Sequence, residues 1–144
     1  MHHIQTQITI NASAERVWEL LMDFPAYPQW NPFIRSIAGT AVVGQQLQVH
    51  IQPPGGSAMK FRPSVLIAQP LQAFRWKGKL LMTGVFDGEH YFQIENIPAG
   101  GVVLRQGEVF SGVLVPLFKR SLDNGTQQGF VAMNEALKRE AEKA

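Results

Sequence analysis

The most informative segment of this chain is Ile8–Phe33, ITINASAERVWELLMDFPAYPQWNPF. An alternating strand that contains Ile8 and Ile10 leads into two polar residues, Asn11 and Ser13. Oxygens of such side chains accept hydrogen bonds from the first free N–H groups of a helix, so a helix is predicted to begin here. Apolar residues then recur at helical spacing, at Val17, Leu20, Leu21 and Phe24. Three prolines follow that prevent a long helix, Pro25, Pro28 and Pro32.

The middle of the chain predicts antiparallel strands joined by short turns. Strands are expected over six segments, Phe33–Thr40, Gln46–Gln52, Met59–Ala68, Ala73–Lys79, Phe86–Glu95 and Val102–Phe110. Short turns between consecutive strands favour an antiparallel meander.

From about Pro116 the period of the apolar residues becomes helical, and Pro116 itself suits the first turn of a helix. Two interpretations are open at the glycines that follow. Either the helix breaks near Asn124, or one long helix carries Gly125 and Gly129 on a single face, where the missing side chains leave room. A long helix with one apolar face must cover the concave side of the sheet.

Composition indicates one globular domain over residues 1–144. Apolar residues make up 45% of the chain and charged residues 17%, which is typical of a packed core rather than disorder. The chain has no cysteine, which excludes disulfides, thiolate metal sites and a cysteine nucleophile. No signal peptide and no apolar run of about 18 residues is found, so we expect a cytoplasmic protein without a transmembrane segment. The net charge of +2, with scattered Lys and Arg, argues against nucleic-acid binding.

Three groups of residues carry a resemblance to a known superfamily. They are Val17-Trp18 with Asp23-Phe24, Tyr27 and Trp30-Asn31-Pro32; Phe74–Gly78 with Phe86–Phe92; and Glu108–Gly112 with Val115–Leu117. In order and spacing they resemble the START-like, Bet v 1-like superfamily (SRPBCC; polyketide cyclase/dehydrase-like proteins). The resemblance implies an α+β helix-grip fold, in which a curved antiparallel sheet of six or seven strands wraps around a long C-terminal helix. It also implies two short helices after the first strand, one unbroken C-terminal helix, and a ligand cavity between sheet and helix.

Strand alternation brings two titratable residues to the predicted interior. His90 and Phe92 share one face of their strand, and Gln106, Glu108 and Phe110 share one face of the next. The second assignment is preferred because Phe110 is the largest apolar residue of either face. A buried His beside a Glu can act as an acid/base pair. The same two side chains can instead simply satisfy each other's hydrogen bonds.

The predicted ligand-binding residues combine aromatic side chains, a few polar groups and two glycines. They are Trp30, Phe74, Trp76, Phe86, His90, Phe92, Gln106, Glu108, Phe110, Gly125 and Gly129. Such a mixture is typical of an apolar ligand pocket, although Trp76 and Phe92 suit an ordinary core equally well. For the apolar residues Leu80, Leu81 and Met82 four interpretations are open: a cavity lid, a dimer surface, a membrane contact, or a loop that folds back on the core. The histidines lack ligand-spaced partners and no glycine-rich nucleotide motif occurs, so neither a metal nor a cofactor is predicted.

Three functions remain open from the sequence. The first is binding of a hydrophobic small molecule (a lipid, isoprenoid, polyketide or other aromatic). The second is a cyclase, aromatase or dehydrase that uses His90 and Glu108 as acid and base. The third is a protein-interaction module that regulates a partner enzyme. Binding is favoured because neither residue lies in a motif that demands chemistry, and because apolar residues dominate the face that they share.

Overall fold

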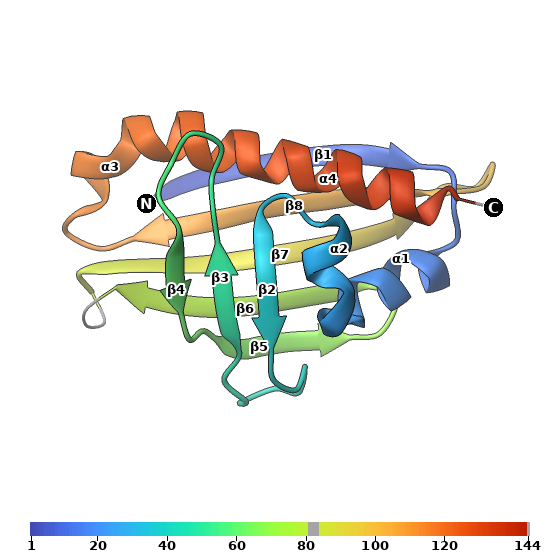
Figure 1. Cartoon of the computed structure of the whole chain (residues 1–144), viewed down its shortest axis with the longest axis horizontal. Helices are drawn as coiled ribbons and strands as arrows, with labels where there is room; N and C mark the ends of the chain where they lie inside the picture. The colour runs from blue at the N-terminus through green and yellow to red at the C-terminus, as the bar shows by residue number, and fades with distance from the viewer. Residues whose placement is uncertain (81–83, 144) are drawn as a thin grey trace.

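Two antiparallel sheets enclose the interior of the protein. The computed structural model describes residues 1–80 and 84–143, so Leu81 and Met82 lie outside the described residues, as does the side chain of Leu80. The main sheet has five strands in the order β1-β8-β7-β6-β5, namely β1 (His2–Ile10), β8 (Val102–Ser111), β7 (Phe86–Asn96), β6 (Ala73–Leu80) and β5 (Ser64–Gln69). The second sheet has three strands, β2 (Ile34–Ala38), β3 (Gln48–Ile51) and β4 (Met59–Phe61), and lies across the main sheet (Figure 1).

Two short helices follow the first strand, as predicted. The α1 helix (Ala14–Met22) begins where Ser13 Oγ accepts a hydrogen bond from the backbone N–H of Arg16, at 3.1 Å. A 3-10 turn (Phe24–Ala26) and the α2 helix (Tyr27–Trp30) come next. Burial, and then the nearby charge of Asp23, raise the pKa of Tyr27 above its ordinary value. Its hydroxyl therefore stays protonated and donates to the Leu21 carbonyl at 2.7 Å, which ties α2 to α1.

The strand predicted over Met59–Ala68 is divided in the structure. It forms β4, which pairs with β3 in the small sheet, and β5, which pairs with β6 in the main sheet. The division lies at Arg62-Pro63, and a proline has no N–H to donate to a strand partner. The chain therefore crosses from one sheet to the other at this point, and the strands predicted for one sheet belong to two.

The C-terminal helix runs unbroken across the main sheet. It comprises α3 (Val115–Ser121), a π-helical segment (Leu122–Thr126) and α4 (Gln127–Ala141). Of the two interpretations of the glycines, one long helix is correct, and the chain passes Asn124-Gly125 by widening into the π segment. Figure 1 shows α3 at one end of the sheet, with α1 and α2 at the other. The curved sheet, the long helix and the two short helices confirm the predicted helix-grip fold.

The α4 half of this helix closes the core. It buries Phe130, Met133 and Leu137, and it contacts β1 and β8 of the main sheet and the helices α1 and α2. Among the described residues, no helix is both long and apolar enough to span a membrane.

Candidate functional site

Aromatic side chains from β6 and β7 pack around His90 in the interior. The strand register sets Trp76 opposite His90 and Phe74 opposite Phe92. The Trp76 and His90 rings stack, with centroids 4.9 Å apart and planes 19° apart. Phe130 from α4 meets the His90 ring edge-on, also at 4.9 Å. All five side chains are buried, so the structure brings together four predicted site residues and adds Phe130 from the helix.

A chain of buried polar side chains connects His90 to the C-terminal helix and to β1. Gln106 Oε1 accepts from His90 Nε2 at 2.9 Å, and Gln106 Nε2 donates to Asn134 Oδ1 at 2.7 Å. Asn134 Nδ2 then donates to Thr6 Oγ1 at 2.8 Å. The Thr6 hydroxyl returns a hydrogen bond to the Gln106 backbone carbonyl, also at 2.8 Å. Each of these side chains is satisfied within the core, as burial of polar groups requires.

Two backbone carbonyls determine the direction of this polar chain. A carbonyl oxygen only accepts, so Thr6 must donate to Gln106 O and Gln106 Nε2 must donate to Phe130 O, the latter at 3.4 Å. The Gln106 amide oxygen therefore faces His90, and His90 Nε2 must carry a hydrogen. The tautomer of His90 thus follows from contacts on two other elements.

The other ring nitrogen of His90 faces Glu108. His90 Nδ1 lies 3.2 Å from Glu108 Oε1. Since Nε2 already carries a hydrogen, this contact is attractive only with a further proton between the two atoms. That proton makes the pair either an imidazolium with a carboxylate or a neutral imidazole with a carboxylic acid. The His90 side chain is 4% exposed and that of Glu108 is 18% exposed, so Glu108 is the member that a bound molecule can reach.

Gly88 makes room for the Glu108 carboxylate. A Cβ at Gly88 would collide with Glu108 Oε2, and it would also contact the Phe110 ring at 3.5 Å. Gly88 lies on β7 directly opposite Phe110 of β8. Its role was missed from the sequence, where it is an unremarked glycine within a strand; such glycines often mark a close approach.

Three phenylalanines form the end of the site that lies next to α3. The centroid of the Phe86 ring lies 5.8 Å from that of Phe110 and 5.5 Å from that of Phe118 of α3. Phe110 is buried, Phe86 is half-buried and Phe118 is 41% exposed, so exposure increases from the sheet to the helix. The predicted residues Phe86, Glu108 and Phe110 therefore lie together at this end, and Phe118 is a neighbour that the sequence did not assign to the site.

The remaining predicted site residues, Trp30, Gly125 and Gly129, have other neighbours. Trp30 packs on Tyr27, with centroids 5.3 Å apart, and its indole N–H is buried without a hydrogen-bond partner among the described residues. The space above Gly129 is filled by the Phe33 ring, because a Cβ there would collide with it. Gly125 faces Pro53, whose Cβ lies 3.6 Å from the place of its missing side chain.

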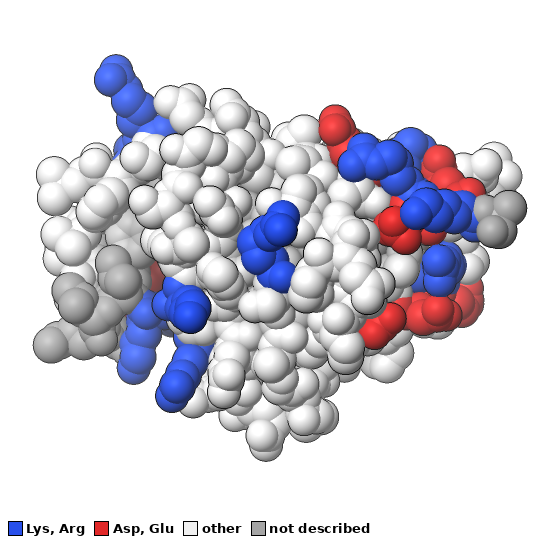
Figure 2. Space-filling model, viewed as in Figure 1, with Lys and Arg blue, Asp and Glu red and all other residues white. Residues whose placement is uncertain are grey.

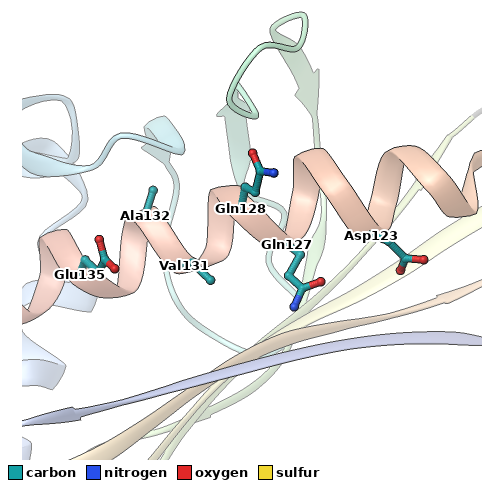
Figure 3. Close-up of a pocket in the computed structure, with 6 residues that line it drawn as sticks. All are labelled: Asp123, Gln127, Gln128, Val131, Ala132 and Glu135. Atoms are coloured by element: carbon teal, nitrogen blue, oxygen red, sulfur yellow. The ribbon is translucent and has the colours of Figure 1, made fainter.

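Two surface hollows lie away from this interior. One, of about 390 Å³, lies along the C-terminal helix, and none of the predicted site residues lines it (Figure 3). The other, of about 410 Å³, lies on the three-stranded sheet. Within residues 1–80 and 84–143, no three His, Asp or Glu side chains come close enough together to hold a metal ion.

Comparisons with known proteins agree with this architecture. A family model described as "Polyketide cyclase / dehydrase and lipid transport" matches residues 1–142. None of the curated proteins compared with the sequence matches it.

Solved structures share the fold at low sequence identity. The di-domain ARO/CYC BexL of the BE-7585A biosynthetic pathway superposes with a TM-score of 0.80 at 13% identity, over 99% of this chain and 50% of BexL. This chain thus spans about half of that protein. The Zhui aromatase/cyclase from Streptomyces sp. R1128 has a TM-score of 0.77 at 17% identity, over 98% and 93% of the two chains. A START superfamily protein from Mycobacterium smegmatis has a TM-score of 0.74 at 21% identity, over 99% and 98%.

Proposed function

We propose that this chain, which belongs to the polyketide cyclase/dehydrase and lipid transport family, binds a hydrophobic small molecule. The ligand lies between the five-stranded sheet and the C-terminal helix. The ligand class is a lipid, an isoprenoid, a polyketide or another aromatic. One observation carries the proposal: a buried chain of hydrogen bonds ends at the His90–Glu108 pair within an aromatic interior. Ligand pockets typically combine such apolar walls with a few positioned polar groups.

In this proposal the polar end of the ligand contacts Glu108. Glu108 Oε1 is engaged by His90, which leaves Oε2, above Gly88, for a hydrogen bond to the ligand. The apolar body of the ligand lies against Phe86, Phe110 and Phe118. Aromatic side chains supply large apolar contact areas for this purpose.

The ligand enters by separating α3 from the sheet. The deeper side chains Phe74, Trp76 and Phe92 pack on one another in this structure, so the ligand must displace side chains rather than occupy an open cavity. The contact between Phe86 and Phe118 is the point where helix and sheet can part. The π segment behind α3 provides the hinge, because a Cβ added at its Gly125 would meet, among the described residues outside the helix backbone, only Pro53 Cβ within 4 Å.

A second candidate function is favoured by the contact between His90 Nδ1 and Glu108 Oε1. A cyclase, aromatase or dehydrase needs a group that takes a proton from a substrate carbon and a group that returns a proton to oxygen. The His90–Glu108 pair can do both at Glu108, while Gln106 acts as a positioning residue that holds the imidazole. General acid/base groups contribute about 10²–10⁴-fold to rate.

Two of the expectations from the sequence belong to the proposal. The absence of cysteine favours the cytoplasm as the compartment. The apolar segment Leu80, Leu81 and Met82 stays a predicted contact surface for a second copy or a transient partner.

Native mass spectrometry of the purified protein tests the proposed binding first. A co-purified apolar molecule is the expected result. An anilinonaphthalene dye then serves as a probe for Trp76→Ala, which should weaken dye binding. Dye binding that stays unchanged while the melting temperature collapses would show that Trp76 is core only.

Glu108→Gln separates carrier from enzyme, because it keeps the shape of the side chain and removes its charge. In a carrier, ligand affinity should change by less than about tenfold, since one hydrogen bond contributes roughly 1 kcal/mol. In an enzyme, turnover should fall by about 10²-fold or more. Glu95→Gln is the matched control, because Glu95 is an exposed residue of the same sheet. Equal effects of the two variants would exclude Glu108 from both roles.

A further inference from the structure

The outer face of the three-stranded sheet carries a basic hollow that the proposed function does not use. It has a volume of about 410 Å³. It is lined by residues of all three strands and by the residue that follows β4, namely Ser36, Gln48, Val49, His50, Lys60, Phe61 and Arg62.

The strand register brings the polar residues of this hollow together. Ser36 of β2 lies opposite His50 of β3, and His50 lies opposite Lys60 of β4, which makes one row across the sheet. Val49 lies opposite Phe61, so Gln48 and Arg62 are level with each other in the next row on the same face. Side chains opposite one another across strands lie about 5 Å apart at Cβ, close enough to contact one small ligand.

This face is positively charged and lacks acidic residues in the hollow. Among the residues that the structure describes, none that lines it is acidic. Within the described part of the chain, no ion pair or side-chain hydrogen bond engages His50, Lys60 or Arg62. Figure 2 shows Lys and Arg on the side of the three-stranded sheet with few acidic side chains near them, whereas acidic side chains gather, together with further Lys and Arg, at the end where α1 and the last turns of α4 lie.

We propose that this hollow binds a phosphate group. An arginine guanidinium and a lysine ammonium are the cations that proteins use for phosphate, the first as a two-pronged donor and the second as a point charge. The Ser36 hydroxyl, the Gln48 amide and the His50 ring add donors from two further strands. These five side chains offer more donors than the two oxygens of a carboxylate need, and they suit the three oxygens and double charge of a phosphate monoester.

A titration with inorganic phosphate, followed by amide chemical shifts at constant ionic strength, tests the proposal. Shifts should be confined to β2, β3 and β4. The double variant Lys60→Gln/Arg62→Gln should bind phosphate at least about tenfold more weakly, since it removes two charge-assisted hydrogen bonds. Acetate should bind the wild type more weakly than phosphate does.

The control removes the same charge elsewhere. Lys119→Gln/Arg120→Gln on α3 should leave phosphate affinity within about twofold, because surface charges that are distant from the ligand are screened by salt. All four residues are exposed, so both proteins should keep the wild-type melting temperature. Equal loss in the two double variants, or shifts spread over the whole surface, would show non-specific attraction and overturn the site.

The source of the phosphate is distinguished by two further probes. Glycerol 3-phosphate tests a soluble monoester, and phosphatidylcholine vesicles with and without phosphatidic acid test a lipid headgroup. Binding of either probe that is lost in Lys60→Gln/Arg62→Gln supports the site and identifies the source. Binding of both probes that survives in this variant would overturn it.

Discussion

The two halves of the C-terminal helix are held in the fold very differently. α4 buries several apolar side chains, namely Phe130, Met133, Ala136, Leu137 and Ala141. α3 buries only Val115, and it leaves Leu117 77% and Phe118 41% exposed. Burial of apolar surface is the main source of stability, so α4 is part of the cooperative core and α3 depends on few contacts. A helix that is continuous in its backbone can therefore be anchored at one end and free to open at the other.

Removing the same aromatic side chain from each half should give the largest difference. Phe130→Ala empties a fully buried position beside His90 and Phe33, so the free energy of unfolding should fall by about 3–5 kcal/mol. Phe118→Ala should cost about 1 kcal/mol or less, as expected at a part-exposed site. Urea unfolding of both variants measures the difference. Comparable losses would mean that α3 belongs to the core after all.

Two asparagines, one on α4 and one in the π segment, should also differ in their effect on stability. Asn134→Ala on α4 removes the link between Gln106 and Thr6, and should cost about 2 kcal/mol because a buried donor and acceptor lose their partner. Asn124→Ala, at an exposed position of the π segment, should stay within about 0.5 kcal/mol of the wild type. The nitrogen resonances of His90 provide a second measurement, because Asn134→Ala should change them and Asn124→Ala should not. An unchanged His90 spectrum in Asn134→Ala contradicts the positioning role of this chain.

Alanine substitutions at Gly129 and Gly125 should change the stability of the fold in opposite directions. Gly129→Ala forces a methyl group against the Phe33 ring and should cost about 1–2 kcal/mol through overpacking. Gly125→Ala meets only ordinary contact with Pro53 and should stabilise the helix by up to about 1 kcal/mol. Thermal melts suffice to show the sign. Stabilisation by both substitutions would mean that Phe33 moves aside freely.

The smallest effect concerns the end of α4 and depends on pH. A hydrogen bond from Lys138 Nζ, and then one from the backbone N–H of Asn11 at 2.7 Å, lower the pKa of Glu142. A carboxyl whose pKa is lowered in the folded state stabilises the fold above its unfolded pKa, and this stabilisation is lost as pH falls through the folded value. The difference in melting temperature between wild type and Glu142→Gln should thus be present at neutral pH and vanish in acid. Growth of the difference on acidification would reverse the assigned sign.

Period-two alternation predicted correctly which residues of two neighbouring strands face the interior. It placed His90 and Phe92 on the inner face of one strand, and Glu108 with Gln106 on the inner face of the next. Thr6 and Asn134 were not assigned, although each carried a signal. Thr6 alternates with Ile4 and Ile8 on an apolar face, and Asn134 is four residues after Phe130 and three before Leu137 on the apolar face of a helix.

Other features could not follow from local patterns. The division of Met59–Ala68 between two sheets depends on which strands pair, and pairing is a property of the whole chain. The sequence predicts a ligand beside Gly129, and in this structure the ring of Phe33, from a distant segment, fills the space above that glycine. The basic hollow could not be predicted from local patterns either. Strand pairing alone places His50 and Ser36 beside Lys60 and Arg62.

The π segment has a consequence for the phase of the helix. Val115, Phe118 and Leu122 follow one another at α-helical spacing, and so do Phe130, Met133 and Leu137. Leu122 and Phe130, however, are eight positions apart, whereas side chains seven positions apart lie on the same face of an α-helix. In an ideal α-helix the two rows of apolar side chains, or stripes, would therefore be rotated by about 80° relative to each other. The π segment absorbs the surplus residue and brings the stripes back into line. Deleting Asn124 should therefore be tolerated, because it leaves a regular α-helix with the same side chains facing the sheet.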